Sequence, residues 1–424
     1  MTAQHLPGDG PFFEEWRDKE PGAHRSLARA RAVGAALGTW DGTPPVLTVV
    51  GSKGKGTTAV HAAATLSAAI VAGDRPAHVG LVSSPGLRTN RERMRVDGRA
   101  ITPEDYEDLA QALARARGSV PSTRDGYLSP TGAFTIAGAA WAADRGSDVL
   151  VLEEGLGGRS DEVSLFDPQV VAVTRVFYEH GDLLGPTLGD VARDLLGVVG
   201  PATRTIVTVE QDAEVTAIVE ETAARFGTSV VTVTADSPTA TTGLPPITRL
   251  NAALGEAAAH AMAAVLGWPV DDAAATAALA SVRIPGRMSR HVLDGVPVMA
   301  DGAISPEGVA AAVTEYLGWH GRLDTVVASF PDTKDVAACF AELRGFDRVI
   351  PARADDYLKF SRAEDLHGEV LDARTAIGHG MEVARAEGGG CLLIGTQSYM
   401  GLVLDALDVG TDTAFERPPG APAN

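Results

Sequence analysis

Residues 46–64 read VLTVVGSKGKGTTAVHAAA, and this stretch decides the fold. A short aliphatic run leads into three closely spaced glycines with two lysines, and an alanine-rich segment follows. A strand, a glycine loop and a helix start in this order form a cradle for phosphate. The glycines let backbone N–H groups converge on the anion, and the positive end of the helix dipole adds to the attraction. We therefore expect a nucleotide phosphate to bind here.

The loop offers two side chains for nucleotide chemistry. Lys55 supplies a mobile positive charge for the terminal phosphates, and the Thr57 hydroxyl can bind Mg²⁺. The expected nucleotide-binding loop comprises Gly51, Ser52, Lys53, Gly54, Lys55, Gly56, Thr57 and Thr58. The strict pattern G-x-x-x-x-G-K-[ST] is not met, because position 49 is Val and Gly56 separates Lys55 from Thr57. The plainer alternative is an ordinary glycine-rich turn with solvated lysines.

Strand and helix signals alternate along the rest of the chain. Short β-branched runs predict strands at 46–50, 149–152, 170–176, 205–209, 229–233, 325–329 and 391–395. Alanine-rich segments predict helices at 59–72, 105–117, 135–145 and 251–266. This alternation indicates an α/β fold whose mostly parallel sheet is covered on both faces.

We place the domain boundary at the stretch Ile284-Pro285-Gly286-Arg287, where a Pro-Gly pair interrupts a helical region and a new strand–turn–helix pattern begins. We expect an ATP-binding domain with a P-loop and N-terminal helices over residues 1–285. A smaller, Rossmann-like α/β domain should follow over residues 286–424. The proline-rich tail, residues 417–424, is expected to be disordered.

Composition excludes several classes of partner. The chain has 424 residues and a formal net charge of −19, which disfavours nucleic acid and anionic membranes as partners. Cys339 and Cys391 are too few for a disulfide framework and lack zinc-site spacing. The longest nearly apolar stretch, residues 62–73, is too short for a membrane span, and residues 1–20 contain no apolar signal core. We expect a cytoplasmic monomer or homodimer acting on small molecules.

The loop at residues 51–58 resembles the G-T-N-G-K-G-[ST] loop of the folylpolyglutamate synthases, members of the Mur ligase superfamily. Further segments are similar to motifs of that family in the same order: SSPGLRTNRER at 83–93, LEEGLGGR at 152–159, HGDLLG at 180–185, NAA at 251–253, PGR at 285–287 and KD at 334–335. So many separated matches in one order make chance a poor explanation.

The resemblance implies an ATP- and Mg²⁺-dependent ligase, in which a carboxylate takes the γ-phosphoryl group and an amine attacks the resulting acyl phosphate. It implies catalytic roles for Lys55, Glu153, His180 and Arg287, and metal ligation by Thr57, Glu153 and His180. The nucleotide would further contact Asn251, Arg287 and Asp301, so ATP would be bound between the two domains. We expect the substrates to contact Ser83, Ser84, Arg88, Arg93 and Arg159.

Each of these residues also has a plainer explanation. Glu153 could cap a helix, Asn251 could be an N-cap, and His180 could be structural. Arg91, Arg93 and Arg95 alternate and could form one solvated face of a strand.

Several positions depart from the family pattern. Leu195 stands where most members have a lysine that becomes carbamylated and bridges the metals. Ile304 and Ser305 replace the His and Asn of the family's D-x-A-H-N-P. Gly86 replaces the His of S-S-P-H-L, and residues 131–132 are Thr-Gly where an F-E pair is expected. Since the last two positions border the pterin side in the family, we expect a carboxylate other than a standard folate.

The leading hypothesis is therefore a ligase that joins an amino acid or other amine to a carboxylate. Two alternatives remain open. One is a non-catalytic homologue that binds nucleotide and acts as a partner subunit, and the other is a true folylpolyglutamate synthase with altered substrate contacts.

Overall fold

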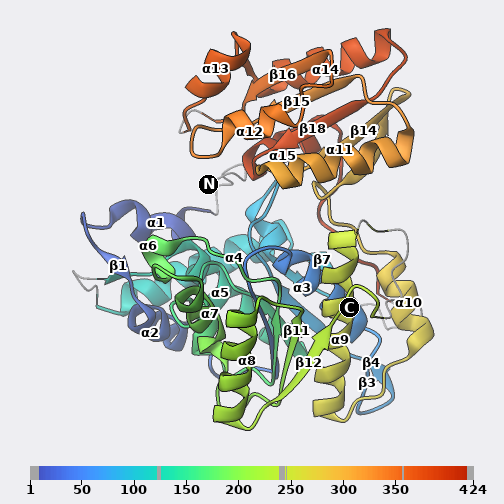
Figure 1. Cartoon of the computed structure of the whole chain (residues 1–424). Coiled ribbons are helices and arrows are strands. Elements are labelled where there is room, and N and C mark those ends of the chain that lie inside the picture. The colour runs from blue at the N-terminus through green and yellow to red at the C-terminus, as the bar shows by residue number, and fades with distance from the viewer. Residues whose placement is uncertain (1–8, 122–125, 238–243, 245, 356–357, 418–424) are drawn as a thin grey trace. The chain divides into compact units, whose positions relative to one another are not determined.

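The computed structural model describes residues 9–121, 126–237, 244, 246–355 and 358–417 (Figure 1). Contacts within the chain divide these residues into two units. The large unit holds residues 9–85, 91–283 and 412–417, and the small unit holds residues 86–90 and 284–411. The predicted domain ranges, 1–285 and 286–424, stay a prediction, and of the tail expected to be disordered only Arg417 lies within the described residues.

Two short segments are therefore separated in sequence from the unit in which they pack. Residues 86–90 belong to the small unit although both flanking stretches belong to the large one. Conversely, the chain returns to the large unit after residue 411, where Ala100 N donates to Asp412 O at 2.8 Å and Ala414 N donates to Gly98 O at 2.8 Å. Nothing in the sequence predicted either exchange.

An eight-stranded sheet lies at the centre of the large unit, in the order β12-β11-β10-β2-β9-β5-β6-β7. Its strands are β2 (Val46–Val50), β5 (Val79–Val82), β6 (Met94–Val96), β7 (Arg99–Ala100), β9 (Val149–Glu153), β10 (Val170–Val173), β11 (Thr205–Val209) and β12 (Ser229–Val233). The strands from β12 to β5 are parallel, whereas β6 and β7 pair in antiparallel fashion. Burial on both faces explains why the central strands read as continuous apolar runs.

Helices cover both faces of this sheet (Figure 1). One apolar cluster joins the sheet to α3 (Lys55–Leu66), α9 (Pro246–Leu266) and α10 (Asp272–Ala280). The opposite cluster joins it to α5 (Pro130–Asp144), α7 (Leu188–Leu195) and α8 (Ala213–Phe226). A third cluster packs α1 (Gly10–Asp18), α2 (Leu27–Leu37) and α4 (Pro103–Ser119) onto α5. The remaining short elements are β1 (His24–Arg25) with β8 (Gly126–Tyr127), β3 (Ile70–Val71) with β4 (Arg75–Pro76), and α6 (Gly181–Leu184).

The small unit is built on a six-stranded sheet in the order β13-β14-β18-β15-β16-β17. These strands are β13 (Ser289–Leu293), β14 (Val296–Asp301), β15 (Thr325–Ser329), β16 (Arg348–Arg353), β17 (Leu371–Asp372) and β18 (Cys391–Gly395), of which only β13 is antiparallel to its neighbour. One apolar cluster includes α11 (Pro306–His320), α12 (Val336–Ala341) and α13 (Ser361–His367). The other includes α14 (Ala373–Ala386) and α15 (Gln397–Ala406).

The predicted α/β class with mostly parallel sheets is confirmed, and each strand run predicted from sequence contains a strand. The helix predicted at 59–72 is wrong at both ends. It begins at Lys55, directly after the glycine loop, and ends at Leu66, because Ile70–Val71 forms β3 and pairs with β4. Within the described ranges, no helix combines the length and the apolar character needed to cross a membrane.

Close packing of α9 on α3 gives a test of this architecture. A Cβ atom on Gly255 would overlap the carbonyl oxygen of Thr58 and lie 3.0 Å from Ala62 N. Because these are backbone atoms, Gly255→Ala should lower the free energy of unfolding by about 1–3 kcal/mol. Gly118→Ala in α4 is the matched control, since a Cβ there meets nothing within 4 Å, and it should be neutral or stabilise by up to about 1 kcal/mol. Urea unfolding of both variants measures the difference, and equal stabilities would contradict the packing.

Candidate functional site

The phosphate loop leaves β2 at Gly51 and enters α3 at Lys55. Gly54 has a φ of 93°, in the left-handed region, and a Cβ atom on it would overlap the side-chain amide of Asn251. Glycine is required here by backbone conformation and by space. Asn251 lies inside α9 rather than at its start, so the N-cap alternative for this residue is wrong. The fold thus brings the two predicted nucleotide-binding residues Gly54 and Asn251 together.

Hydroxyl groups tie the loop to its surroundings. The Ser52 hydroxyl accepts from Phe177 N and lies 3.1 Å from Phe177 O, to which it donates. Thr58 Oγ1 donates to Asn251 O at 3.0 Å. Lys53, by contrast, is exposed, and its Nζ lies 5.4 Å from the centre of the Phe177 ring. Thr57 is buried in the first turn of α3.

Lys55 is surrounded by acceptors. Its Nζ donates to Gly51 O at 2.6 Å and to Ser52 O at 3.3 Å, and it forms an ion pair with Glu154 Oε1 at 2.9 Å. Burial opposes the charge on this ammonium, but the carboxylates of Glu154 and Glu153 outweigh that effect and raise the pKa of Lys55 above its ordinary value. Lys55 therefore stays charged, as a phosphate ligand must.

Glu153 ends β9 beside the start of α3. Its Oε2 accepts from Ser84 N at 2.9 Å, and both of its carboxylate oxygens lie 3.5 Å from where a Cβ of Gly56 would be. Arg93 donates from Nη1 to Ser84 Oγ at 3.0 Å, and its guanidinium lies 4.6 Å from the centre of the Phe134 ring. Three predicted site residues, Glu153, Ser84 and Arg93, are thus linked in one chain of contacts. Arg93 is half-buried, and its hydrogen bond to Ser84 Oγ holds the Ser84 side chain in position.

The residues near the loop fit a magnesium ion. Mg²⁺ prefers oxygen ligands and is commonly held by one or two carboxylates together with substrate phosphates and water. Glu153 offers such a carboxylate from the end of β9, the strand that pairs with β2, and Thr57 offers a hydroxyl from the first turn of α3. In the part of the chain that the structure describes, no three His, Cys, Asp or Glu side chains are grouped to hold a metal by themselves. A metal at this place would consequently depend on the phosphates of the nucleotide.

The predicted second metal position is less well supported. His180 is exposed, adopts a φ of 50° and directly precedes the short helix α6. Leu195 is buried, with 2% of its surface exposed, and packs in the apolar cluster of α7 and α8. An apolar side chain cannot ligate a metal, so α7 contributes none from this position.

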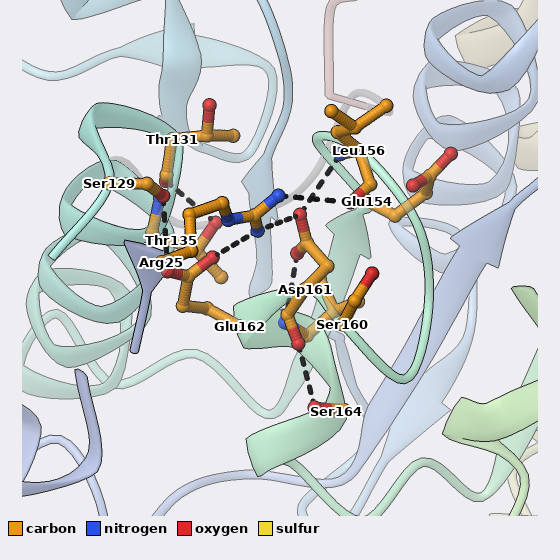
Figure 2. Close-up of polar contacts among 12 residues, drawn as sticks. Arg25, Ser129, Thr131, Thr135, Glu154, Leu156, Ser160, Asp161, Glu162 and Ser164 are labelled. Atoms are coloured by element: carbon orange, nitrogen blue, oxygen red, sulfur yellow. Dashed lines mark hydrogen bonds and ion pairs between the residues drawn. The ribbon is translucent and has the colours of Figure 1, made fainter. Parts of the chain in front are cut away.

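A glycine-rich loop, residues 155–159, follows β9 and is braced by buried carboxylates (Figure 2). Asp161 Oδ2 accepts from Leu156 N at 3.0 Å, and Asp194 Oδ1 accepts from Gly158 N at 2.9 Å. Arg25 donates to Leu156 O at 3.0 Å. The predicted substrate residue Arg159 projects from this loop with 72% of its side chain exposed.

Arg25 also neutralises two fully buried acids. Its Nη2 lies 2.9 Å from Asp161 Oδ2 and 2.7 Å from Glu162 Oε2, and Figure 2 shows the guanidinium between them. Burial raises the pKa of Glu162, as does the neighbouring Asp161, whereas Arg25 opposes the rise. Glu162 further accepts from Ser129 Oγ at 3.0 Å.

The position of Glu162 bears on one of the positions that depart from the family pattern. A Cβ atom on Gly132 would overlap the carboxylate of Glu162. Gly132 is the position at which the resemblance leads one to expect a glutamate. A carboxylate from a different element, the 3₁₀ helix Glu162–Leu165, therefore lies directly against this position.

Ser83 lies in the large unit, where its N donates to Arg93 O at 2.8 Å, and the other remaining predicted residues lie in the small unit. Asp301 ends β14 and accepts from Met288 N at 2.7 Å and from Ala303 N at 2.8 Å. Burial raises the pKa of Asp301, and Arg287 opposes this rise. A Cβ atom on Gly302, the residue after Asp301, would overlap Arg287 Nη1, so the two predicted nucleotide ligands lie near each other. Ser305 caps α11 by accepting from Gly308 N.

The side chain of Arg88 bonds to other residues of the small unit. Its guanidinium donates to Val409 O at 2.7 Å and pairs with Asp405 at 3.0 Å. Asp405 also pairs with Arg374 at 2.9 Å. A direct contact of Arg88 with substrate stays a proposal, and its partners indicate a structural role in holding residues 86–90.

Sequence reasoning missed four charged residues of the site: Arg25, Glu154, Asp161 and Glu162. Glu154 carries a signal that could have been used, since two acids in a row directly after an apolar strand are unusual for a buried position. Of the other three, Asp161 and Glu162 are adjacent in sequence, and Arg25 meets them through the fold.

The ion network predicts a large effect on stability. Arg25→Met would leave Asp161 and Glu162 buried without a countercharge and should lower the free energy of unfolding by about 3–5 kcal/mol. Arg175→Met, which breaks the exposed pair of Arg175 with Asp212, should cost less than about 1 kcal/mol. Adding Glu162→Gln to Arg25→Met should restore part of the loss. Chemical unfolding followed by circular dichroism checks all three, and a similar loss for the two single variants would refute the role given to Arg25.

No protein-family model matches the chain. Several curated proteins are similar to the chain in sequence. The chain is 32% identical over 341 residues to a probable bifunctional folylpolyglutamate synthase/dihydropteroate synthase of Halobacterium salinarum, covering 74% of this chain and 40% of that protein. It is 29% identical over 334 residues to the dihydrofolate synthase/folylpolyglutamate synthase of Escherichia coli, covering 75% of each. The chain thus spans about two fifths of the length of the Halobacterium relative and three quarters of the Escherichia coli one.

Solved structures show the same fold. The apo form of the L. casei folylpolyglutamate synthase superimposes with a TM-score of 0.80 at 20% identity, covering 94% of this chain and 99% of that one. The Mycobacterium tuberculosis folylpolyglutamate synthase complexed with ADP gives a TM-score of 0.78 at 21% identity, covering 95% and 99%. The resemblance inferred from the motifs is confirmed: the chain is similar in sequence to proteins named folylpolyglutamate synthase, and it has the Mur ligase-type fold of the solved ones.

Proposed function

We propose that the chain is an ATP-dependent ligase that joins a carboxylate to an amine. The phosphate loop carries this proposal, because it sets a charged Lys55 at the start of α3 and the Glu153 carboxylate beside it. Related proteins named as folylpolyglutamate synthases, including one solved with ADP and one with AMPPCP, support a nucleotide at this loop.

The proposed reaction forms and breaks bonds in two steps. The substrate carboxylate attacks the γ-phosphorus of ATP and releases ADP, and an amine then attacks the acyl phosphate, which releases phosphate and leaves an amide. Lys55 and the N–H groups of residues 51–58 would stabilise the charge on the transferred group. Magnesium, when bound near Thr57 and Glu153, would supply further neutralisation of the phosphate oxygens. Ser84 holds the Glu153 carboxylate in place through its backbone N–H.

Folates are the first carboxylates to test. The relatives are named for folylpolyglutamate and dihydrofolate synthesis, which does not favour the expectation of a non-folate substrate. One of the sequence arguments for that expectation, the absent glutamate at Gly132, is also weakened, because the carboxylate of Glu162 lies directly against that position. The other, Gly86 in place of histidine, stands. We therefore infer a folate-type carboxylate and an amino acid as the substrates.

A second candidate function is nucleotide binding without ligation, in a partner subunit. The observation that favours it is the apolar burial of Leu195, where the resemblance implies a metal-bridging lysine. Binding of AMPPCP without any release of phosphate from ATP, across folates and other carboxylates, would support this candidate over the ligase.

Replacement of the loop lysine tests the nucleotide site. Lys55→Ala should reduce ATP-dependent phosphate release by at least about 100-fold, because the charge on the transferred phosphoryl group loses its nearest cation. Lys53→Ala is the matched control, since Lys53 is exposed and lies over Phe177, and it should cost less than about tenfold. A coupled phosphate-release assay measures both, with circular dichroism to verify folding. Wild-type rates in Lys55→Ala would exclude this loop as the catalytic phosphate site.

A substrate panel tests the folate assignment. Dihydropteroate or a folate with glutamate should release phosphate from ATP and give a product heavier by one glutamyl residue. Mass spectrometry identifies that product. Carboxylates without a pterin ring, offered with the same amine, serve as the comparison, and turnover restricted to them would reject the folate assignment while keeping the ligase.

A further inference from the structure

Glu154 is a buried acid that the proposed reaction does not use. It follows β9 directly, and 2% of its surface is exposed. Oε1 pairs with Lys55 Nζ at 2.9 Å, whereas Oε2 has no hydrogen-bond partner among the described residues. Burial raises the pKa of Glu154 to about 8 against the opposing effect of Lys55. No other cation is paired with this carboxylate in the described part of the chain.

The contacts of Lys55 leave no donor for a ligand. An ammonium group has three N–H donors. Those of Lys55 are directed to Gly51 O, Ser52 O and Glu154 Oε1. A phosphate oxygen can bind Lys55 only if one of these three acceptors gives way or shares its proton.

The three acceptors are not equivalent. Gly51 O and Ser52 O are neutral carbonyls, and Glu154 is the one carboxylate among them, so it makes the charge-assisted bond. If Lys55 turned from Glu154 to a phosphate, the carboxylate would stay buried, and Asp161 and Glu153 would still repel its charge. Loss of the countercharge from a buried acid is costly.

We propose that Glu154 competes with the nucleotide phosphates for Lys55 and so lowers the affinity of the phosphate loop for ATP. This inference rests on the proposed function, since it takes the phosphate loop as the ATP site. Glu154 acts through Lys55 and is therefore a positioning residue rather than a catalytic one. Its carboxylate sets how tightly ATP is held before reaction.

Glu154→Gln tests the competition directly. The amide keeps the size of the side chain and an acceptor for Lys55 but removes the charge. Titration calorimetry with AMPPCP at one fixed pH above the pKa of Glu154 of about 8, where the wild-type carboxylate is charged, should give a Kd lower than that of the wild type by about tenfold. Glu154→Leu, which removes the acceptor altogether, should also bind more tightly, and it provides a second reading if the amide variant fails to fold.

Glu179→Gln is the matched control. Glu179 also lies close enough to act on Lys55 electrostatically, but no ion pair or hydrogen bond joins the two in the part of the chain that the structure describes. Its loss should change the Kd for AMPPCP by less than about twofold. An equal gain in affinity for AMPPCP in both variants would show that any negative charge near Lys55 weakens binding, and it would overturn the specific role of Glu154.

The outcomes separate the inference from the function on which it rests. Tighter binding in Glu154→Gln, with little change in Glu179→Gln, supports the competition. Unchanged or weaker binding in the Glu154 variants, with wild-type binding intact, overturns the competition and leaves the nucleotide site standing. Absence of AMPPCP binding in the wild type and in every Glu154 variant would reject the proposed function, and the inference with it.

Discussion

Pairing of buried charge is the constraint on which the site depends. The chain turns sharply after β9, and the acids Glu154, Asp161 and Glu162 are all enclosed there. Burying an ionised carboxylate costs about several kcal/mol unless a cation or N–H groups compensate its charge. Lys55 and Arg25 supply the positive charges from distant parts of the chain. The conformation of the glycine-rich loop and the place of the phosphate-loop lysine are therefore consequences of one electrostatic balance.

Local sequence signals were enough to predict the frame of this site. The run Val46–Val50, the glycines after it and the alanine-rich segment beyond are contiguous, so strand, loop and helix could be inferred without knowing the fold. The same holds for Glu153, which ends an apolar run in a parallel sheet, where ligands commonly bind. Helix ends were harder to predict, because alanine favours a helix without marking where it begins or ends. Ile70–Val71, for example, forms a strand that pairs with β4.

Features that depend on two distant segments could not be predicted in this way. Gly132 looked like the loss of an acid until the fold placed Glu162 against it. Arg25 carries no motif of its own, yet it neutralises two acids more than a hundred residues later. The sequence predicts a substrate contact for Arg88 and gives no sign of its ion pair with Asp405. In each case a physical requirement of charge or space is met across the fold, and a single sequence does not display that pairing.

The return of residues 412–417 to the large unit has a consequence for how the protein is made. A ribosome synthesises the chain from its amino end, so the strands of the large sheet emerge long before these residues do. The backbone of Gly98 and Ala100 at the β7 edge can bond to Ala414 and Asp412 only after the whole small unit has been translated. The large unit thus reaches its final form last although its chain begins first. Separate expression of residues 9–283 would leave that edge without its natural cover.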